Sequence, residues 1–168
     1  MRKALVVIDM QNDFVTGALG SAEAQAIVPY VAEKIRQAKQ SGIEVFFTRD
    51  THGEDYLSTA EGKKLPVKHC IKGTEGWEIV PELGCSGAEI VDKPTFGSLV
   101  LAEKLKGFDE VTLCGVCTDI CVISNAVLIK TVSPETRVCA DSRCVAATSV
   151  EANIAALKTM QSLQIDVL

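Results

Sequence analysis

Short apolar runs alternate with longer amphipathic segments along the whole chain, and this alternation limits the fold more than any other feature. The apolar runs are typical of strands buried on both faces: Ala4–Asp9, Ile43–Thr48, Ala88–Val91, Glu110–Val116, Thr136–Ala140 and Gln164–Val167. The amphipathic segments predict helices at about Ile27–Ser41, Gly97–Lys106, Thr118–Lys130 and Ser149–Leu163. Each is long enough to cross over to a parallel neighbouring strand. The alternation therefore predicts a doubly wound, mostly parallel α/β sheet flanked by helices.

The chain is expected to form one domain over residues 1–168, because no composition shift marks a boundary. A chain of 168 residues buries a sizeable core without cross-links. Its seven cysteines are odd in number, so neither a disulfide framework nor a zinc knuckle is expected. One stretch, Arg49–Gly87, has little periodicity, and a loop of that length is usually functional or disordered.

Charge and hydropathy exclude two classes of partner. The net charge is −5, from 17 basic and 22 acidic side chains, and no basic cluster is longer than Lys63–Lys64, which argues against nucleic-acid binding. No apolar run approaches the ~18 residues of a membrane span, and the segment Met1–Asp9 has no signal-peptide pattern. We therefore expect a cytoplasmic protein with a small-molecule partner and no membrane or nucleic-acid partner.

The ends of the predicted strands deliver reactive side chains to one edge of the sheet, where ligands bind in open α/β folds. The first strand ends in Asp9, another in Asp92-Lys93, and the next leads into a segment that contains Cys117 and Cys121. If Thr118 caps the following helix, the first-turn Cys121 lies where backbone N–H groups favour a thiolate. A carboxylate, a cation and a thiol then converge.

Each of these residues also has an ordinary structural explanation. Cys121 could be a buried helix cysteine and Cys117 competes for its role; Asp9 could form a turn, and Lys93 could be a solvated charge. Together they suggest more: a carboxylate can act as general base for a thiol, and a nearby cation favours the ionised form of both. Asp9 is the candidate base, because both histidines lie elsewhere.

Those two histidines belong to a second cluster in the long aperiodic stretch. Asp50 and His52 are two residues apart, so their side chains point the same way in extended chain, and Glu61 and His69 follow. Two imidazoles with one or two carboxylates can bind Zn²⁺, Mn²⁺ or Fe²⁺. The spacing matches no self-sufficient metal motif, and the alternative is a set of polar loop residues.

Three motifs together resemble the isochorismatase-like cysteine hydrolases over essentially the whole chain, with the nicotinamidases as the most similar group. They are VVIDMQNDF, DKPTFGS and GVCTDICV, in the family's order. The resemblance implies a Rossmann-like six-stranded sheet and a catalytic triad of Asp9, Lys93 and Cys121. It also implies a cis peptide between Val116 and Cys117, with the backbone N–H groups of Cys117 and Cys121 forming an oxyanion hole.

The resemblance to nicotinamidases further implies one divalent transition metal, zinc or else manganese or iron. Its ligands would be Asp50, His52, Glu61 and His69, the last within LPVKHC. The chain departs from the group at Leu65, where several members have an aromatic that stacks on the substrate, and at Asn153, where relatives often have a histidine. The residues then expected to bind the substrate are Phe14, Leu65, Trp77 and Phe96, with Phe14, and Trp77 or Phe96, left to clamp a ring.

The predicted function is hydrolysis of nicotinamide to nicotinate and ammonia through a Cys121 thioester. The first alternative is a related hydrolase of another small amide, ureide or carbamoyl compound; hydrolysis of an isochorismate-type vinyl ether does not need the cysteine. The second is a non-catalytic protein in which Cys117 and Cys121 bind a metal or are oxidised. Apolar helices at the sheet's flanks would also permit a homo-oligomer.

Overall fold

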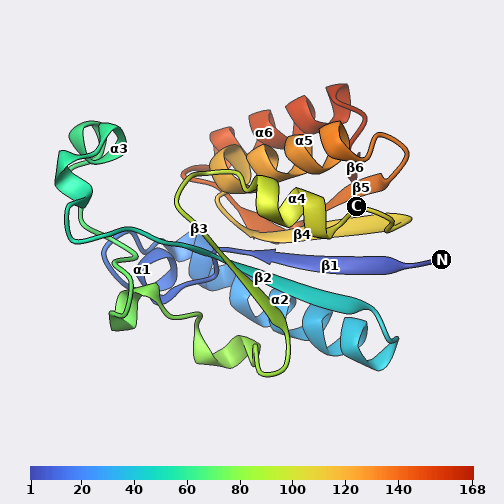
Figure 1. The fold of residues 1–168 in the computed structure, drawn as a ribbon, viewed down its shortest axis with the longest axis horizontal. Coiled ribbons are helices and arrows are strands. Elements are labelled where there is room, and N and C mark those ends of the chain that lie inside the picture. Colours follow the sequence, from blue (N-terminus) through green and yellow to red (C-terminus); the bar gives the residue numbers. More distant parts are fainter.

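Six parallel strands form a single twisted sheet in the computed structural model, which describes residues 1–168 (Figure 1). The strands are β1 (Lys3–Ile8), β2 (Glu44–Asp50), β3 (Glu89–Lys93), β4 (Glu110–Val116), β5 (Arg137–Ala146) and β6 (Asp166–Val167). Their order is β3-β2-β1-β4-β5-β6, and every neighbouring pair is parallel. The predicted α/β fold and its six strands are confirmed, and the sheet is parallel throughout rather than mostly so.

Helices cover both faces of the sheet (Figure 1). The long helix α2 (Ala22–Gln40) lies on one face, and α4 (Leu99–Lys104), α5 (Ile123–Val132) and α6 (Val150–Ser162) lie on the other. Alternate residues of β1 divide between the two cores: Val6 and Ile8 pack with α4–α6, whereas Leu5 and Val7 pack with α2. This division explains why the strand is apolar at every position from Ala4 to Ile8.

Two element boundaries differ from the sequence prediction for local reasons. Helix α2 begins at Ala22, before the predicted Ile27, because the Ser21 hydroxyl caps it by accepting from the Ala24 N–H at 3.0 Å. Strand β5 runs past Ala140 to Ala146, with a register shift against β4. A bulge of this kind lets a strand continue while its side chains change direction.

The long aperiodic stretch is ordered into short elements rather than forming an open loop. Most of them lie at the carboxyl edge of the sheet, and the last packs on α2. These elements are the single turns η1 (Tyr56–Ser58), η2 (Glu75–Trp77) and η3 (Pro81–Leu83), and the short helix α3 (Ala60–Lys64). The short helix α1 (Asn12–Val15) follows β1 at the same edge. No helix has the length and apolar character that crossing a membrane would require.

Strands β1 and β4 approach closely where they deliver residues to this edge. A Cβ atom on Gly115 would lie 2.0 Å from the carbonyl oxygen of Ile8, and Gly115 has φ +107°. Only glycine fits both the contact and the backbone conformation. The end of β4, and the turn that carries Cys117 and Cys121, therefore lie directly beside Asp9, which itself has φ +49°.

Candidate active site

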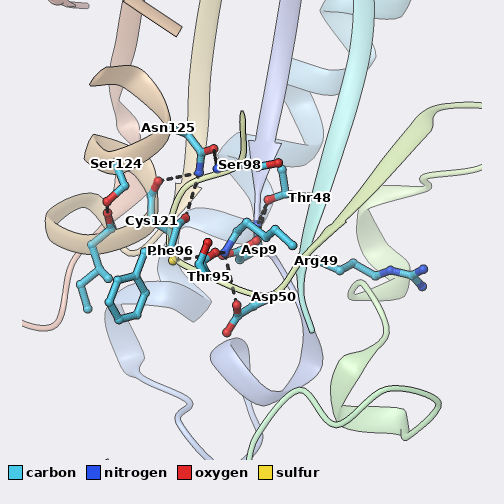
Figure 2. Close-up of polar contacts among 12 residues, drawn as sticks. Asp9, Thr48, Arg49, Asp50, Thr95, Phe96, Ser98, Cys121, Ser124 and Asn125 are labelled. Atoms are coloured by element: carbon cyan, nitrogen blue, oxygen red, sulfur yellow. Dashed lines mark hydrogen bonds and ion pairs between the residues drawn. The ribbon is translucent and has the colours of Figure 1, made fainter. Parts of the chain in front are cut away.

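A buried lysine stands between the carboxylate and the thiol that the sequence singled out. The Nζ of Lys93 lies 2.6 Å from Oδ2 of Asp9 and 3.5 Å from Sγ of Cys121. It also donates to the Thr95 carbonyl at 3.2 Å and lies 3.3 Å from Oδ1 of Asp50. Lys93 and Asp9 are fully buried, and Cys121 is 5% exposed. Figure 2 shows Asp9, Asp50 and Cys121 facing this common centre.

The Asp9 carboxylate is held in place by the neighbouring strand. The hydroxyl of Thr48, on β2, donates to Oδ1 of Asp9 at 2.6 Å and accepts from the Asp9 backbone N–H at 3.1 Å (Figure 2). Because one oxygen is fixed in this way, the other remains directed at Lys93. Thr48 was not among the residues expected from the sequence, although a polar residue at the end of the apolar run was a signal for it.

Burial and mutual charge shift the pKa values of Asp9, Lys93 and Cys121. Burial raises the pKa of Asp9 above its usual value, although the charge of Lys93 acts in the opposite direction. Burial would lower the pKa of Lys93, but the charges of Asp9, Cys121 and Asp50 outweigh it and raise the pKa. Burial also raises the pKa of the Cys121 thiol well above its usual value, with Asp9 adding to the effect. Burial thus opposes the thiolate that a helix start would favour, and the sulfur needs a base to become a nucleophile.

The turn that carries Cys121 differs from the predicted helix start. Residues Thr118–Val122 form one π-helical turn, in which the Val122 N–H donates to the Cys117 carbonyl, and the regular helix α5 follows. Thr118 does not cap it: this residue lies inside the turn, and its buried hydroxyl has no hydrogen-bond partner. The prediction of a Thr118 cap is wrong, because the wider turn moves the helix start.

The peptide between Val116 and Cys117 is cis, which is the geometry that the resemblance implies. The backbone N–H of Cys117 donates no hydrogen bond within the protein, and Cys117 lines the same cavity as Cys121. An unpaired amide at a cavity wall can bind an oxygen of a ligand. Burial raises the pKa of the Cys117 thiol to about 12, as it raises that of Cys121, but it is the Cys121 sulfur that lies against Lys93.

Four potential metal ligands meet beside this group. One ligand atom from each of Asp50, His52, Glu61 and His69 lies within 4.8 Å of the others. Oδ2 of Asp50 is 2.9 Å from Nε2 of His52 and 3.6 Å from Nε2 of His69. Oε1 of Glu61 is 3.8 Å and 3.9 Å from the same two nitrogens. The strand end of β2 supplies the first two ligands, and the segment around α3 supplies the others.

The protonation of the cluster suits a cation. Burial opposes the charge of Asp50, but hydrogen bonds from His52 and His69 and the charge of Lys93 together lower its pKa. The Nδ1 of His69 lies 2.8 Å from the Val67 carbonyl, which leaves Nε2 toward the cluster. A backbone acceptor on one ring nitrogen is the usual way to orient a metal-binding histidine. Two imidazoles and two carboxylates are a ligand set of transition metals such as zinc.

A cavity of about 470 Å³ opens over both groups of residues. Its floor includes Cys121, Asp50 and His69, and its walls include three residues predicted to contact a ring: Phe14, Leu65 and Phe96. Trp77, the fourth, does not line the cavity. Its indole stacks on the Arg49 guanidinium at 3.5 Å and donates to the Thr51 hydroxyl at 2.8 Å, so it packs behind the site. Its placement among the ring-contacting residues is therefore not supported.

Two further buried amides support the site and were missed by the sequence analysis. The Gln11 side chain accepts from the Asp50 backbone N–H at 2.7 Å and donates to the Asp50 carbonyl at 2.9 Å, which fixes that residue. Asn125, in the first turn of α5, bonds to the backbone of Cys121. Gln11 stands in the motif VVIDMQNDF, where a second polar residue after a buried strand was a signal. Nothing in the sequence distinguishes Asn125.

A known protein family matches almost the whole chain. The family model of the isochorismatase domain matches residues 3–168. The chain belongs to the isochorismatase family. The predictions of this family, of its α/β fold and of a hydrolase are thereby confirmed.

Individual members resemble this isochorismatase-family hydrolase over its whole length. The nicotinamidase/pyrazinamidase of Mycobacterium tuberculosis is 29% identical, over 98% of this chain and 97% of that protein. The crystal structure of the pyrazinamidase of Pyrococcus horikoshii in complex with zinc superposes with a TM-score of 0.88 and 32% identity, over 100% of this chain and 99% of that one. The N-carbamoylsarcosine amidase of Thermoplasma acidophilum superposes with a TM-score of 0.82 and 25% identity, over 99% and 95% of the chains.

Proposed function

We propose that the protein is a nicotinamidase that hydrolyses nicotinamide to nicotinate and ammonia through a thioester on Cys121. The observation that carries the proposal is the position of Lys93, whose Nζ touches both the Asp9 carboxylate and the Cys121 sulfur at the floor of the cavity. The similarity to nicotinamidase/pyrazinamidases over the whole chain supports the choice of substrate.

The first half of the reaction uses Asp9 as a proton carrier. Asp9 takes the proton of the Cys121 thiol, and the sulfur attacks the carboxamide carbon. The negative charge thus moves from one neighbour of Lys93 to another, so the buried ammonium stabilises both states. The backbone N–H groups of Cys117 and Cys121 bind the developing oxyanion. When the tetrahedral intermediate collapses, the C–N bond breaks and Asp9 returns its proton to the leaving nitrogen as ammonia.

The second half reverses these roles with water. Asp9 removes a proton from a water molecule, the hydroxide attacks the thioester carbonyl, and the C–S bond breaks. The proton returns to the Cys121 sulfur, which restores the resting thiol. The net reaction consumes one amide and one water and yields one carboxylic acid and one ammonia.

We further propose that Asp50, His52, Glu61 and His69 hold one divalent metal, with zinc as the first candidate. The mutual approach of their ligand atoms and the orientation of His69 fit such an ion. A bound transition metal supplies an electrophilic centre to which a pyridine nitrogen can coordinate. The apolar walls, Phe14 and Phe96 among them, then hold the ring with its carboxamide over Cys121.

The test is ammonia release from nicotinamide by the purified protein, by a Cys121→Ala variant, and by protein treated with a chelator and then supplied with zinc, manganese or iron. Wild-type release, loss in Cys121→Ala with unchanged melting temperature, and loss on chelation with recovery on metal addition would all agree with the proposal. Retained activity in Cys121→Ala would refute the mechanism, and activity indifferent to chelation would refute the metal's role.

A second substrate class deserves the same assay because of one residue. Leu65 stands at the cavity wall where the resemblance implies a stacking aromatic, so a flat ring gains less from this wall. An N-carbamoyl amino acid, which has no flat ring, therefore belongs in the panel, with pyrazinamide as a second ring amide for comparison. Release of ammonia from the carbamoyl compound but not from nicotinamide would support the cysteine mechanism and show that the substrate is a carbamoyl compound.

A further inference from the structure

The side chain of Asn125 ties two parts of the active site together. It is fully buried, and its amide makes three hydrogen bonds. Nδ2 donates to the Cys121 carbonyl at 2.8 Å and to the Phe96 carbonyl at 3.1 Å, and Oδ1 accepts from the Ser98 N–H at 3.0 Å. Figure 2 shows the amide between the turn that carries Cys121 and the segment that carries Phe96 and Ser98.

The segment between β3 and α4 connects the catalytic lysine to the cavity wall. It begins directly after Lys93, whose Nζ donates to the carbonyl of Thr95. The next residue, Phe96, lines the cavity over Cys121. The segment ends at Ser98, whose hydroxyl caps α4 by accepting from the Leu101 N–H. A shift of this segment would therefore move a wall of the substrate cavity.

The ring of Phe96 is not fixed by burial. The residue is 46% exposed, and its outer side borders a shallow surface groove with Ile123 and Leu128. A half-exposed ring gains too little from packing to hold one position, because lost rotamer freedom offsets the contact energy. Its position is set instead by its backbone, whose carbonyl accepts from Asn125. Lys93 and the Thr95 hydroxyl bond the carbonyls on either side, at Thr95 and Gly97, and Asn125 also accepts from the Ser98 N–H.

We propose that Asn125 is a positioning residue that fixes the Phe96 wall at a set distance from Cys121 and thereby sets affinity for the ring of the substrate. This inference rests on the proposed amidase function of the site. Asn125 does not reach the reacting atoms, and it acts through the two backbone segments that it joins. The bonds to Phe96 and Ser98 govern substrate affinity, and the bond to Cys121 keeps the nucleophile turn in register.

An Asn125→Thr variant separates these roles. A hydroxyl in this helix can donate to the carbonyl four residues earlier, as Ser124 does to Ile120 at 2.6 Å and Thr131 does to Val127 at 2.8 Å. Thr at 125 therefore keeps a bond to Cys121 but is too short to bond Phe96 and Ser98. We expect KM to rise about five- to tenfold, as for the loss of one or two hydrogen bonds, with kcat within about twofold.

The control is Thr131→Ala, which removes a similar hydroxyl bond from an exposed position of the same helix and should leave both constants unchanged. A double-mutant cycle with Phe96→Ala tests whether Asn125 affects KM through the position of Phe96. Phe96→Ala alone should raise KM, and adding Asn125→Thr should raise it no further. An unchanged KM in Asn125→Thr, a fall in kcat instead, or independent effects of the two substitutions would overturn the proposal. Asn125→Ser carries the same test should the Thr variant not fold.

Two measurements without substrate separate this inference from the proposed function. Hydrogen exchange at the Ser98 amide should be at least about tenfold faster in Asn125→Thr, because its acceptor is gone. Alkylation of Cys121 by iodoacetamide should stay within about twofold of the wild-type rate, because its turn is retained. If the wild-type protein hydrolyses no amide, the proposed function is refuted but the positioning role is not. Unchanged hydrogen exchange at Ser98 in Asn125→Thr, or a changed rate of Cys121 alkylation, would refute the positioning role.

Discussion

Replacing Lys93 with methionine tests the electrostatic core of the site. The substitution keeps the length of the side chain but removes the only cation in contact with the buried carboxylate of Asp9, and it also removes a contact of Asp50. Removing one partner of a buried ion pair costs about 3–5 kcal/mol, because the other charge stays desolvated. For a chain of 168 residues this lowers the melting temperature by about 6–20 °C.

The measurement is thermal and urea unfolding in the presence of a chelator, so that no bound metal contributes to stability. The matched control is Lys106→Met, which breaks an exposed pair with Glu103 and should cost at most about 1 kcal/mol. Asp9→Asn in the Lys93→Met background should restore most of the lost stability, because it removes the uncompensated charge.

The pH dependence of the Lys93→Met variant has a definite sign. Burial already raises the pKa of Asp9 in the folded protein, and loss of the lysine charge raises it further. The folded state then binds a proton that the unfolded state releases, so stability falls as the pH rises through the usual carboxylate range toward neutrality. The deficit against wild type should shrink at pH 5. A loss no larger than that of Lys106→Met, or a deficit independent of pH, would refute the reasoning.

Three other predictions concern the frame around the site. Gly115→Ala should cost about 2–6 kcal/mol in urea unfolding because of strain and the clash with Ile8, whereas Gly42→Ala, with φ +68° and open space around it, should cost only about 1–2 kcal/mol. Asp141→Asn should cost about 1–3 kcal/mol at pH 7 and almost nothing near pH 3. Burial opposes the charge of Asp141, but the Lys34 ion pair and the Arg143 N–H outweigh it and lower the pKa, so the stability that the carboxylate adds is present above its usual pKa and is lost as the pH falls. An equal cost at both pH values would contradict this. Trp77→Phe should leave KM unchanged because Trp77 lies outside the cavity, whereas Phe14→Leu should raise it. A rise in KM for Trp77→Phe with none for Phe14→Leu would contradict this.

The fold was predictable because its signal is repeated along the chain. Apolar runs recur along the chain, and the central strand β1 shows the reason: Val6 and Val7 pack into opposite cores, so both faces of the strand are covered. The candidate site was predictable for a related reason: parallel strands bring their carboxyl ends to one edge, so Asp9, Asp50 and Lys93 had to lie near one another. Both predictions follow from the order of elements along the chain and need no knowledge of how individual side chains pack.

What the sequence did not reveal depends on packing between segments far apart in the chain. The π-helical turn at Thr118–Val122 has no composition of its own, so the expected Thr118 cap was wrong. The hydroxyl of Thr48 and the amide of Asn125 are ordinary residues until folding places them beside Asp9 and Cys121. Trp77 shows the converse, since an aromatic near the site in sequence packs on Arg49 behind it. The raised pKa of the Cys121 thiol likewise follows from burial, which no local motif records.

The most direct test of the central claim is the mass of the protein during turnover. Wild-type protein mixed with nicotinamide and quenched in acid within one turnover should carry one added nicotinoyl group, and peptide mapping should place that group on Cys121. The Asp9→Asn variant should show none, because the thiol would keep its proton. Ammonia release with no acyl group on any cysteine, or with the group on Cys117, would contradict the account.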